Sequence, residues 1–328
     1  MKPTDTAEIR QTGLKITRLG LGGAPLAGLF SGVSPEQATA TIESHLDRGM
    51  NFMDTAPMYA HGLSELRMGR VLSKRNRDTF VLATKVGRLL EPDPKPDSGG
   101  LWNEIPPYRW VFDFSYDAAM RSLEESLKRL NLDRVDILHI HDPDNHYDEA
   151  MRGAYRALIK LRSEGVVKAI GAGMNQAEML TRFAREGDFD CFLLAGRYTL
   201  IDHTGLKELL PVCVEKKISI IVGGPYNSGI LATGAVEGAT FNYIPAPPEI
   251  MEKVRRVEGV CARHHVPLNA AALQFPLAHP AIAAVIPGGR SPAEVEENLR
   301  LIEHPIPSDF WQELRTEKLI PDQAPTPG

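Results

Sequence analysis

Eight short runs of branched and other apolar residues recur along this chain of 328 residues, and longer amphipathic stretches separate most of them. This alternation is typical of repeated β-α units around a parallel sheet. The predicted strands are residues 17–22, 50–54, 80–85, 135–139, 167–172, 191–195, 218–222 and 283–286.

Eight such units predict a closed (β/α)8 TIM barrel, because right-handed crossovers keep adding parallel neighbours until the last strand meets the first. We expect one domain over residues 1–328, with the Pro-rich end at 321–328 as a disordered tail. An open doubly wound sheet is the alternative. It would need a G-x-G-x-x-G turn after an early strand to seat a dinucleotide, and no such turn is present.

Helical patterns at 34–48, 117–130 and 308–320 fit the segments between and after the strands. Two long connections, 88–112 and 226–248, are rich in Pro, Gly and aromatic residues and are predicted as loops. Loops that follow barrel strands lie at the C-terminal face, where active sites form. Their aromatic residues either wall a substrate pocket there or only anchor the loops: Trp102, Tyr108, Trp110, Tyr226, Phe241 and Tyr243.

Composition excludes several classes of protein. A net charge of −5 without a block of Lys and Arg argues against nucleic-acid binding. No apolar stretch marks a signal peptide or a membrane span, so a cytoplasmic location is expected. The odd number and wide spacing of Cys191, Cys213 and Cys261 do not fit disulfides or zinc, and we expect three buried apolar residues and no metal site.

Ionisable residues gather at the carboxyl ends of the predicted strands. Asp54 ends the second strand, Lys85 ends the third and His141 follows the fourth, while Tyr59 lies five residues after Asp54. A buried charge needs a partner, so Asp54 and Lys85 are expected to pair. A nearby ammonium would lower the pKa of Tyr59 and suit it to proton transfer. Each residue alone also has a structural explanation, as a loop anchor, a strand end or a helix cap.

Five separated motifs resemble the aldo-keto reductase family over nearly the whole chain: FMDTAPMY, LATKVGR, LHIHDPD, GVVKAIGAGMN and VIPGGRSPAEVEENL. By that resemblance Asp54, Tyr59, Lys85 and His141 fill the catalytic tetrad of the family. The neighbouring His139 lies on the same side of its strand and takes a supporting or structural role.

The resemblance also implies a nicotinamide cofactor held in extended form at the C-terminal face without a dinucleotide fingerprint. Gly22, Asp54 and Asn175 match positions near the nicotinamide. The substrate, a sugar or an aldehyde, would contact Tyr59, His141, Trp102 and Trp110. Segments 225–231 and 288–298 match positions around the pyrophosphate and adenosine, through Pro225, Tyr226, Asn227, Gly229, Leu231, Gly288, Arg290, Glu294, Glu297 and Asn298.

Three departures from the family pattern bear on the cofactor. Gly223 stands where many members carry a tyrosine that stacks on nicotinamide, so stacking is either absent or supplied by Tyr226. Gly288 and Gly289 replace a frequent Lys-Ser pair, and Glu294 replaces an arginine. A carboxylate would repel the 2'-phosphate of NADP and accept from the free ribose hydroxyl of NAD. NAD is therefore favoured, while Arg290 keeps NADP open.

Further motifs, GGPYNSGIL, GAGMNQ and FWQELRTEKLI, resemble the branch of the family that oxidises cyclic hemiacetals to lactones. The expected substrates, in order, are an aldose such as L-fucose or D-arabinose, then pyridoxal, then a general aldehyde or ketone. Oxidation with NAD would use Tyr59 mainly as a base, with Lys85 and Asp54 tuning its pKa and His141 orienting the substrate oxygen.

Two other classes of function stay open from the residues alone. A barrel of this kind can serve as a cofactor-sensing regulatory subunit without turnover. A metal-dependent hydrolase could instead use His139, His141, Asp142 and Asp144 as ligands. The oligomeric state is left open.

Overall fold

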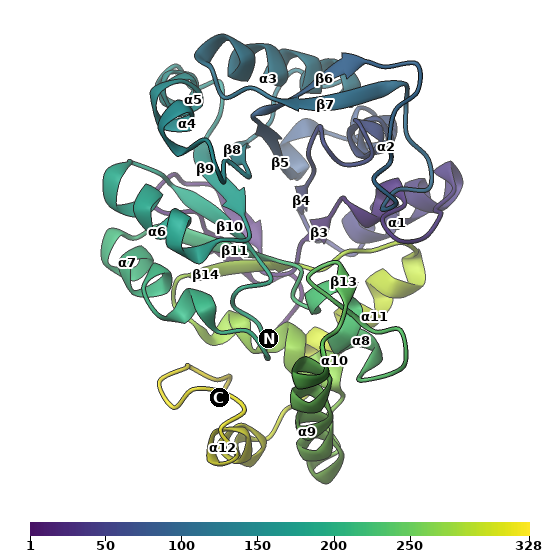
Figure 1. The fold of residues 1–328 in the computed structure, drawn as a ribbon, viewed down its shortest axis with the longest axis vertical. Coiled ribbons are helices and arrows are strands. Elements are labelled where there is room, and N and C mark those ends of the chain that lie inside the picture. Colours follow the sequence, from purple (N-terminus) through teal and green to yellow (C-terminus); the bar gives the residue numbers. More distant parts are fainter.

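A computed structural model describes all 328 residues, and a parallel sheet of eight strands forms its centre. The strand order is β14-β11-β10-β9-β8-β5-β4-β3, and bridges from Leu19 to Val285 and from Gly22 to Gly288 join the two edges. Figure 1 shows these strands as a ring inside the helices, which confirms the predicted (β/α)8 barrel. The barrel strands are β3 (Leu21–Gly22), β4 (Phe52–Asp54), β5 (Val81–Val86), β8 (Ile137–His141), β9 (Ala169–Met174), β10 (Cys191–Ala195), β11 (Ser219–Gly223) and β14 (Ile282–Ile286).

The predicted first strand, residues 17–22, is wrong in its first half. Thr17 ends β2 (Lys15–Thr17), which pairs antiparallel with β1 (Thr6–Glu8), and only Leu21–Gly22 joins the barrel. The hairpin forms because Ile9 and Ile16 pack, fully buried, among the apolar residues inside the barrel. The β1–β2 hairpin therefore closes the end of the barrel opposite the carboxyl ends of the strands.

The helices surround the barrel and cover its outer face (Figure 1). The predicted helices at 34–48, 117–130 and 308–320 are confirmed as α1, α3 and α12, with α12 ending earlier than expected. Ser34 caps α1 by accepting from the backbone N–H of Gln37. The helices are α1 (Pro35–Asp47), α2 (Leu63–Leu72), α3 (Tyr116–Leu130), α4 (Tyr147–Arg152), α5 (Ala154–Ser163), α6 (Ala177–Glu186), α7 (Leu209–Lys216), α8 (Ile230–Thr233), α9 (Pro248–His264), α10 (Leu268–Gln274), α11 (Pro292–Glu303) and α12 (Ser308–Thr316).

The two largest apolar cores have the sheet between them. The larger, of 75 residues, includes the side chains that pack the helices onto the outside of the strands, and the smaller, of 13, fills the barrel. The small inner core includes Phe52, Val81, Ala83 and Ile137. Because side chains alternate along a strand, the next inward positions on these strands belong to polar residues.

The two long connections contain regular structure that their composition did not predict. Residues 88–112 begin and end as an antiparallel pair, β6 (Arg88–Pro92) with β7 (Tyr108–Phe112). The five prolines lie in or beyond the ends of these strands and so leave most of the ladder intact. The connection at 226–248 holds α8 and a second small hairpin, β12 (Thr240–Phe241) with β13 (Ile244–Pro245).

The last residues lie against α12, where Arg315 donates to the carbonyl of Ala324 and to the hydroxyl of Thr326. The single domain and the disordered tail stay predictions. All three cysteines are buried and free, as expected. None of the helices combines the length and the apolarity that crossing a bilayer requires.

Candidate active site

The carboxyl ends of β4, β5 and β8 bring three ionisable side chains into the mouth of the barrel. Asp54 follows Phe52 at the second inward position of β4, Lys85 follows Ala83 on β5, and His141 follows His139 on β8. The register staggers these positions by one inward residue from strand to strand, since Asp54 pairs with Ala83 and Lys85 pairs with His139. The long Lys85 side chain spans this stagger to reach Asp54, and Lys85 and His141 line the same cavity, so the three predicted residues converge at the mouth of the barrel.

Lys85 is the centre of the cluster. Its Nζ donates to Asp54 Oδ2 at 2.7 Å, to the Thr55 carbonyl at 2.8 Å and to Tyr59 Oη at 3.1 Å. An ammonium has three N–H groups, so all of them are used. The side chains of Lys85 and Asp54 are 1% and 2% exposed, which makes this a buried ion pair, as expected from the sequence.

Tyr59 and His141 lie next to each other above this pair. Their rings meet edge to face with centroids 5.8 Å apart, and Trp102 approaches Tyr59 from another direction at 6.3 Å. The Nε2 atom of His141 is 3.5 Å from Asp142 Oδ2. A small oxygen-bearing molecule beside Tyr59 would therefore meet an imidazole, a phenol and an ammonium together.

Burial controls the protonation of the cluster. It raises the pKa of Tyr59 well above its ordinary value, and the charge of Asp54 adds to that rise. The expected lowering of this pKa by Lys85 is therefore wrong for the structure as it stands. Burial also lowers the pKa of His139 to about 3 and, followed by the charges of Arg88 and Lys85, holds the pKa of His141 well below its usual range. Tyr59 is a phenol and the two histidines are neutral near neutral pH.

Two adjoining cavities are lined by Tyr59. The larger, of 380 Å³, runs from Asp54 and Tyr59 to Glu297 and Asn298 on α11. The smaller, of 260 Å³, is lined by Lys85, His141 and Asp142. The two share six lining residues: Ala24, Leu29, Tyr59, Leu193, Ala195 and Tyr243. Two ligands, one in each cavity, would meet at the hydroxyl of Tyr59.

Most of the residues predicted to hold a cofactor line the larger cavity: Gly22, Asp54, Pro225, Tyr226, Gly229, Gly288, Arg290, Glu294, Glu297 and Asn298. Asn175 lines the smaller one instead. Asn227 and Leu231 are buried and line neither cavity; the Asn227 amide donates to the Gly196 carbonyl. The Tyr226 hydroxyl donates to Asn298 at 2.6 Å, which ties this ring to the end of the cavity formed by α11.

The lining of the larger cavity fits a nicotinamide dinucleotide. Close to Tyr59 the Oδ1 atom of Asp54 is buried without a hydrogen-bond partner, which leaves an acceptor for a ligand. Along the middle, a Cβ built on Gly229 would meet no atom within 4 Å and would point into open space. At the far end Glu297, Asn298 and Asn269 offer polar groups suited to a nucleoside.

The smaller cavity differs from expectation in its aromatic wall. Trp102 lines it, together with Tyr59 and His141, whereas Trp110 does not. Trp110 lies on β7, where its ring covers the Arg88 guanidinium at 4.7 Å. Sequence reasoning missed Asp142 as a residue of this pocket, although its position directly after His141 was a usable signal.

Metal chemistry receives no support from the arrangement of the side chains. No group of three or more His, Cys, Asp or Glu side chains is placed to hold an ion. His139 lies inside the barrel below His141, and Asp142 pairs with Arg88. The four residues considered as ligands therefore do not form one site.

Comparison with known proteins agrees with this geometry. The Aldo/keto reductase family model matches residues 18–317. A pyridoxal 4-dehydrogenase from Microbacterium luteolum is 39% identical, with 98% of this chain and 99% of the relative covered. A D-threo-aldose 1-dehydrogenase from Pseudomonas is 41% identical over 94% and 96% of the two chains. A holo-form aldo-keto reductase from Bacillus halodurans superposes with a TM-score of 0.75 at 25% identity, covering 96% of each chain. The chain belongs to the aldo/keto reductase family and is an NAD(P)-dependent oxidoreductase.

Proposed function

We propose that the protein oxidises a cyclic hemiacetal, an aldose such as L-fucose or D-arabinose, at C1 to its lactone, with NAD as the preferred cofactor. The observation that carries this proposal is that two cavities of different size meet at Tyr59, with Lys85 and Asp54 behind it and His141 beside it. The relative named D-threo-aldose 1-dehydrogenase supports this substrate class.

In this proposal the substrate lies in the smaller cavity with its C1 hydroxyl between Tyr59 and His141. The C1–H bond breaks with its electron pair leaving the carbon, the O–H proton passes to the oxygen of Tyr59, and the C1–O bond becomes the lactone carbonyl. A bound oxidised nicotinamide supplies the acceptor for the departing hydride. Neutral His141 orients the oxygen through a hydrogen bond.

Lys85 and Asp54 prepare Tyr59 for this role. The Lys85 Nζ atom donates to the Tyr59 oxygen, so it stabilises the phenolate that must form before Tyr59 can act as a base. Because burial raises the pKa of Tyr59, only a small fraction of this side chain is phenolate near neutral pH, and that fraction grows as pH rises. Oxidation should therefore become faster with increasing pH.

NAD preference rests on the contacts of Arg290 and Glu294. The Glu294 carboxylate accepts from the Arg290 backbone N–H at 2.8 Å and from its Nε at 2.9 Å, so the one cation considered for a 2'-phosphate is already paired. The carboxylate itself would repel such a phosphate. We expect Glu294→Ala to lower the KM for NADP and raise the KM for NAD, moving the NAD/NADP ratio of kcat/KM about 10-fold or more. An unchanged ratio would remove Glu294 from cofactor selection.

Pyridoxal is the second candidate substrate. The match to the relative named pyridoxal 4-dehydrogenase covers 98% of this chain, and the ring of Trp102 beside Tyr59 suits a flat heteroaromatic ring. A general aldehyde or ketone reductase ranks third.

The test is a dehydrogenase assay with NAD and NADP separately against L-fucose, D-arabinose, L-galactose and pyridoxal, following nicotinamide absorbance. Tyr59→Phe should keep cofactor binding, measured by fluorescence titration, and lose turnover by about 10²–10⁴-fold. Near-normal turnover in Tyr59→Phe would overturn the role of Tyr59. Tight cofactor binding without turnover on any substrate would favour a sensing role.

A further inference from the structure

An arginine outside the proposed tetrad reaches the active site through Asp142. Arg88 opens β6, and its guanidinium lies 4.7 Å from the centroid of Trp110 and 4.8 Å from that of Phe112, both on β7. Its Nη2 donates to Asp142 Oδ2 at 2.6 Å. The Arg88 side chain is 9% exposed, so this ion pair is shielded from water far more than a surface pair.

Asp142 is held in an unusual backbone conformation directly after His141. Its φ angle is +44°, in the left-handed region that Asp and Asn tolerate better than most residues. Its N–H donates to the Gly173 carbonyl at 3.0 Å, which joins this turn to β9. Asp142 in this conformation lines the smaller cavity.

One oxygen of Asp142 faces two partners. Oδ2 is 2.6 Å from Arg88 and 3.5 Å from His141 Nε2. A carboxylate at that distance would draw a proton onto the imidazole if nothing neutralised it. Arg88 holds the shorter contact and the opposite charge, so Asp142 presents to His141 as part of an ion pair.

We propose that Arg88 is a positioning residue: by binding and neutralising Asp142 it keeps His141 a neutral imidazole that can hydrogen-bond to the substrate oxygen. This inference rests on the proposed role of His141. It adds a function for the β6–β7 hairpin, whose aromatic side chains hold the guanidinium in place.

The charges around His141 agree in sign with this role. Burial opposes its protonation most, followed by the charges of Arg88 on β6 and Lys85 on β5, and His139 on the same strand adds to them. Tyr59, reached from β4, contacts its ring, and Tyr243, from the turn between β12 and β13, lines the same cavity. Among the carboxylates, Asp54 is paired with Lys85 and Asp142 is paired with Arg88. Asp144 lies beyond Asp142. Removing Arg88 would leave Asp142 as the nearest unpaired charge to His141.

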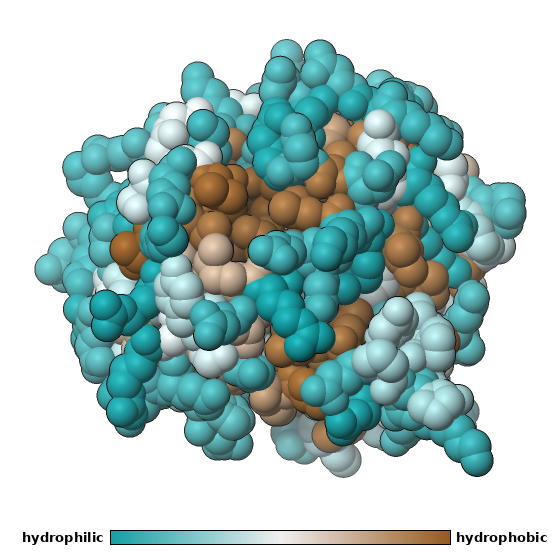
Figure 2. Space-filling model, turned by 90° about the horizontal axis from the view of Figure 1, so that it is seen from above, coloured by the Kyte–Doolittle hydropathy of each residue, from teal (hydrophilic) through white to brown (hydrophobic).

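The β6–β7 hairpin lies at the rim of the barrel beside α3 (Figure 1). Seen from that side, an irregular band of hydrophobic residues interrupts the hydrophilic surface (Figure 2). Within β7, Tyr108 and Phe112 are 39% and 43% exposed, so these rings are only half covered by the rest of the chain. The alternative is a purely structural role, in which Arg88 is only the polar contact that attaches this hairpin to the end of β8. An experiment must distinguish this role from an effect on His141.

Three variants separate the two roles: Arg88→Met, Asp142→Asn and the double variant. Asn tolerates the left-handed conformation, so Asp142→Asn changes the charge and keeps the turn. Arg88→Met should raise the pKa of His141 by about 1–3 units, because Asp142 is then an unpaired carboxylate beside the imidazole. Asp142→Asn should lower the pKa of His141 or leave it unchanged. The double variant should return this pKa to near the wild-type value.

The direct measurement is a pH titration of His141 by NMR on histidine-labelled protein, with His141→Gln to assign the signal. In the assay, the ratio of Arg88→Met to wild-type kcat/KM should fall as pH drops toward the raised pKa of His141, since the Tyr59 dependence is common to both proteins. Arg88→Lys, which keeps the charge and loses the planar fork, should restore the pH dependence with part of the turnover.

A His141 titration that is unchanged in Arg88→Met, with only a loss of thermal stability, would overturn the inference and leave Arg88 as a hairpin anchor. A shift that the double variant fails to reverse would overturn it as well, because the effect would then not pass through Asp142. These outcomes are distinct from failure of the proposed function, which shows in Tyr59→Phe and in the substrate panel with wild-type protein.

Discussion

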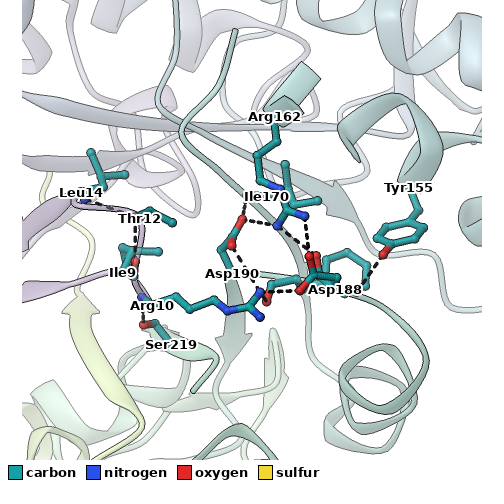
Figure 3. A network of polar contacts seen from close by, with 11 residues as sticks. Ile9, Arg10, Thr12, Leu14, Tyr155, Arg162, Ile170, Asp188, Asp190 and Ser219 are labelled. Carbon is teal, nitrogen blue, oxygen red and sulfur yellow. Dashed lines mark hydrogen bonds and ion pairs between the residues drawn. The ribbon is translucent and has the colours of Figure 1, made fainter. Parts of the chain in front are cut away.

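The two ends of the barrel each hold a cluster of charged side chains, but they differ in how completely the polar atoms are bonded. At the end closed by the β1–β2 hairpin, Arg10 and Arg162 clamp Asp188 and Asp190 (Figure 3). Asp190 Oδ2 accepts from Arg162 at 2.8 Å and from the Ile170 N–H at 2.9 Å, while Oδ1 faces Arg10 at 3.5 Å. Both carboxylate oxygens of Asp190 have partners.

At the mouth of the barrel the bonding is incomplete. Asp54 Oδ1, His141 Nδ1 and the two ring nitrogens of His139 are buried without hydrogen-bond partners. An unmade hydrogen bond of a buried polar group costs about 1–3 kcal/mol. The closed end therefore contributes stability, whereas the mouth leaves polar atoms unbonded, among them the Asp54 Oδ1 acceptor beside the larger cavity.

The largest effect should come from removing the cation at the mouth. Lys85→Met should reduce kcat/KM by about 10³-fold or more and destabilise the protein by about 3–5 kcal/mol, because Asp54 would remain as a buried charge without its partner. Steady-state kinetics and denaturant unfolding measure the two effects.

The matched control for Lys85→Met is the double variant with Asp54→Asn. It should recover most of the lost stability, since no unpaired charge remains, and none of the lost activity. If stability stays low, the pair acts mainly through packing and the contrast between the ends is weakened.

A medium effect is expected at the closed end. Asp190→Asn should destabilise the protein by about 1–3 kcal/mol, because Arg10 and Arg162 lose a shared negative charge and one of its two acceptor oxygens, while kcat/KM stays unchanged. Asp188→Asn is the control: its side chain is 59% exposed, so the change should cost less than about 1 kcal/mol. A large loss of activity in Asp190→Asn would break the distinction between a stabilising end and a catalytic end.

The smallest effect concerns the pH dependence of stability, to which the buried His45 contributes. Burial lowers the pKa of His45 to about 4, and its Nε2 is 3.0 Å from the Phe52 carbonyl on β4. The unfolded chain takes up a proton near pH 6.5 and the folded chain does not, so stability falls as pH drops below that value. His45→Gln should reduce the slope with which the free energy of unfolding falls, by up to about 1.4 kcal/mol per pH unit. Thermal unfolding of both proteins between about pH 7 and pH 5 is the check, and parallel curves would contradict it.

Much of the fold could be predicted because it depends on local patterns. Seven of the eight strands lie within two residues of their predicted positions, as for 191–195, which matches β10. The β1–β2 hairpin could not be predicted, because it is stabilised by barrel residues that are distant in sequence. The β6–β7 pair could not be predicted, because its strands lie in a Pro-rich segment. Ile16, for example, is buried only because the barrel end is there to receive it.

The sequence by itself determined the barrel and the four residues at its mouth, because strand alternation and order along the chain carry that information. Only the tertiary structure decided how the charges act. Burial raises the pKa of Tyr59 despite the adjacent Lys85, Trp110 serves Arg88 instead of the pocket, and Asp142 lies between Arg88 and His141. The physical reason is that desolvation and pairing depend on which distant groups share a space, and these relations do not exist until the chain is folded.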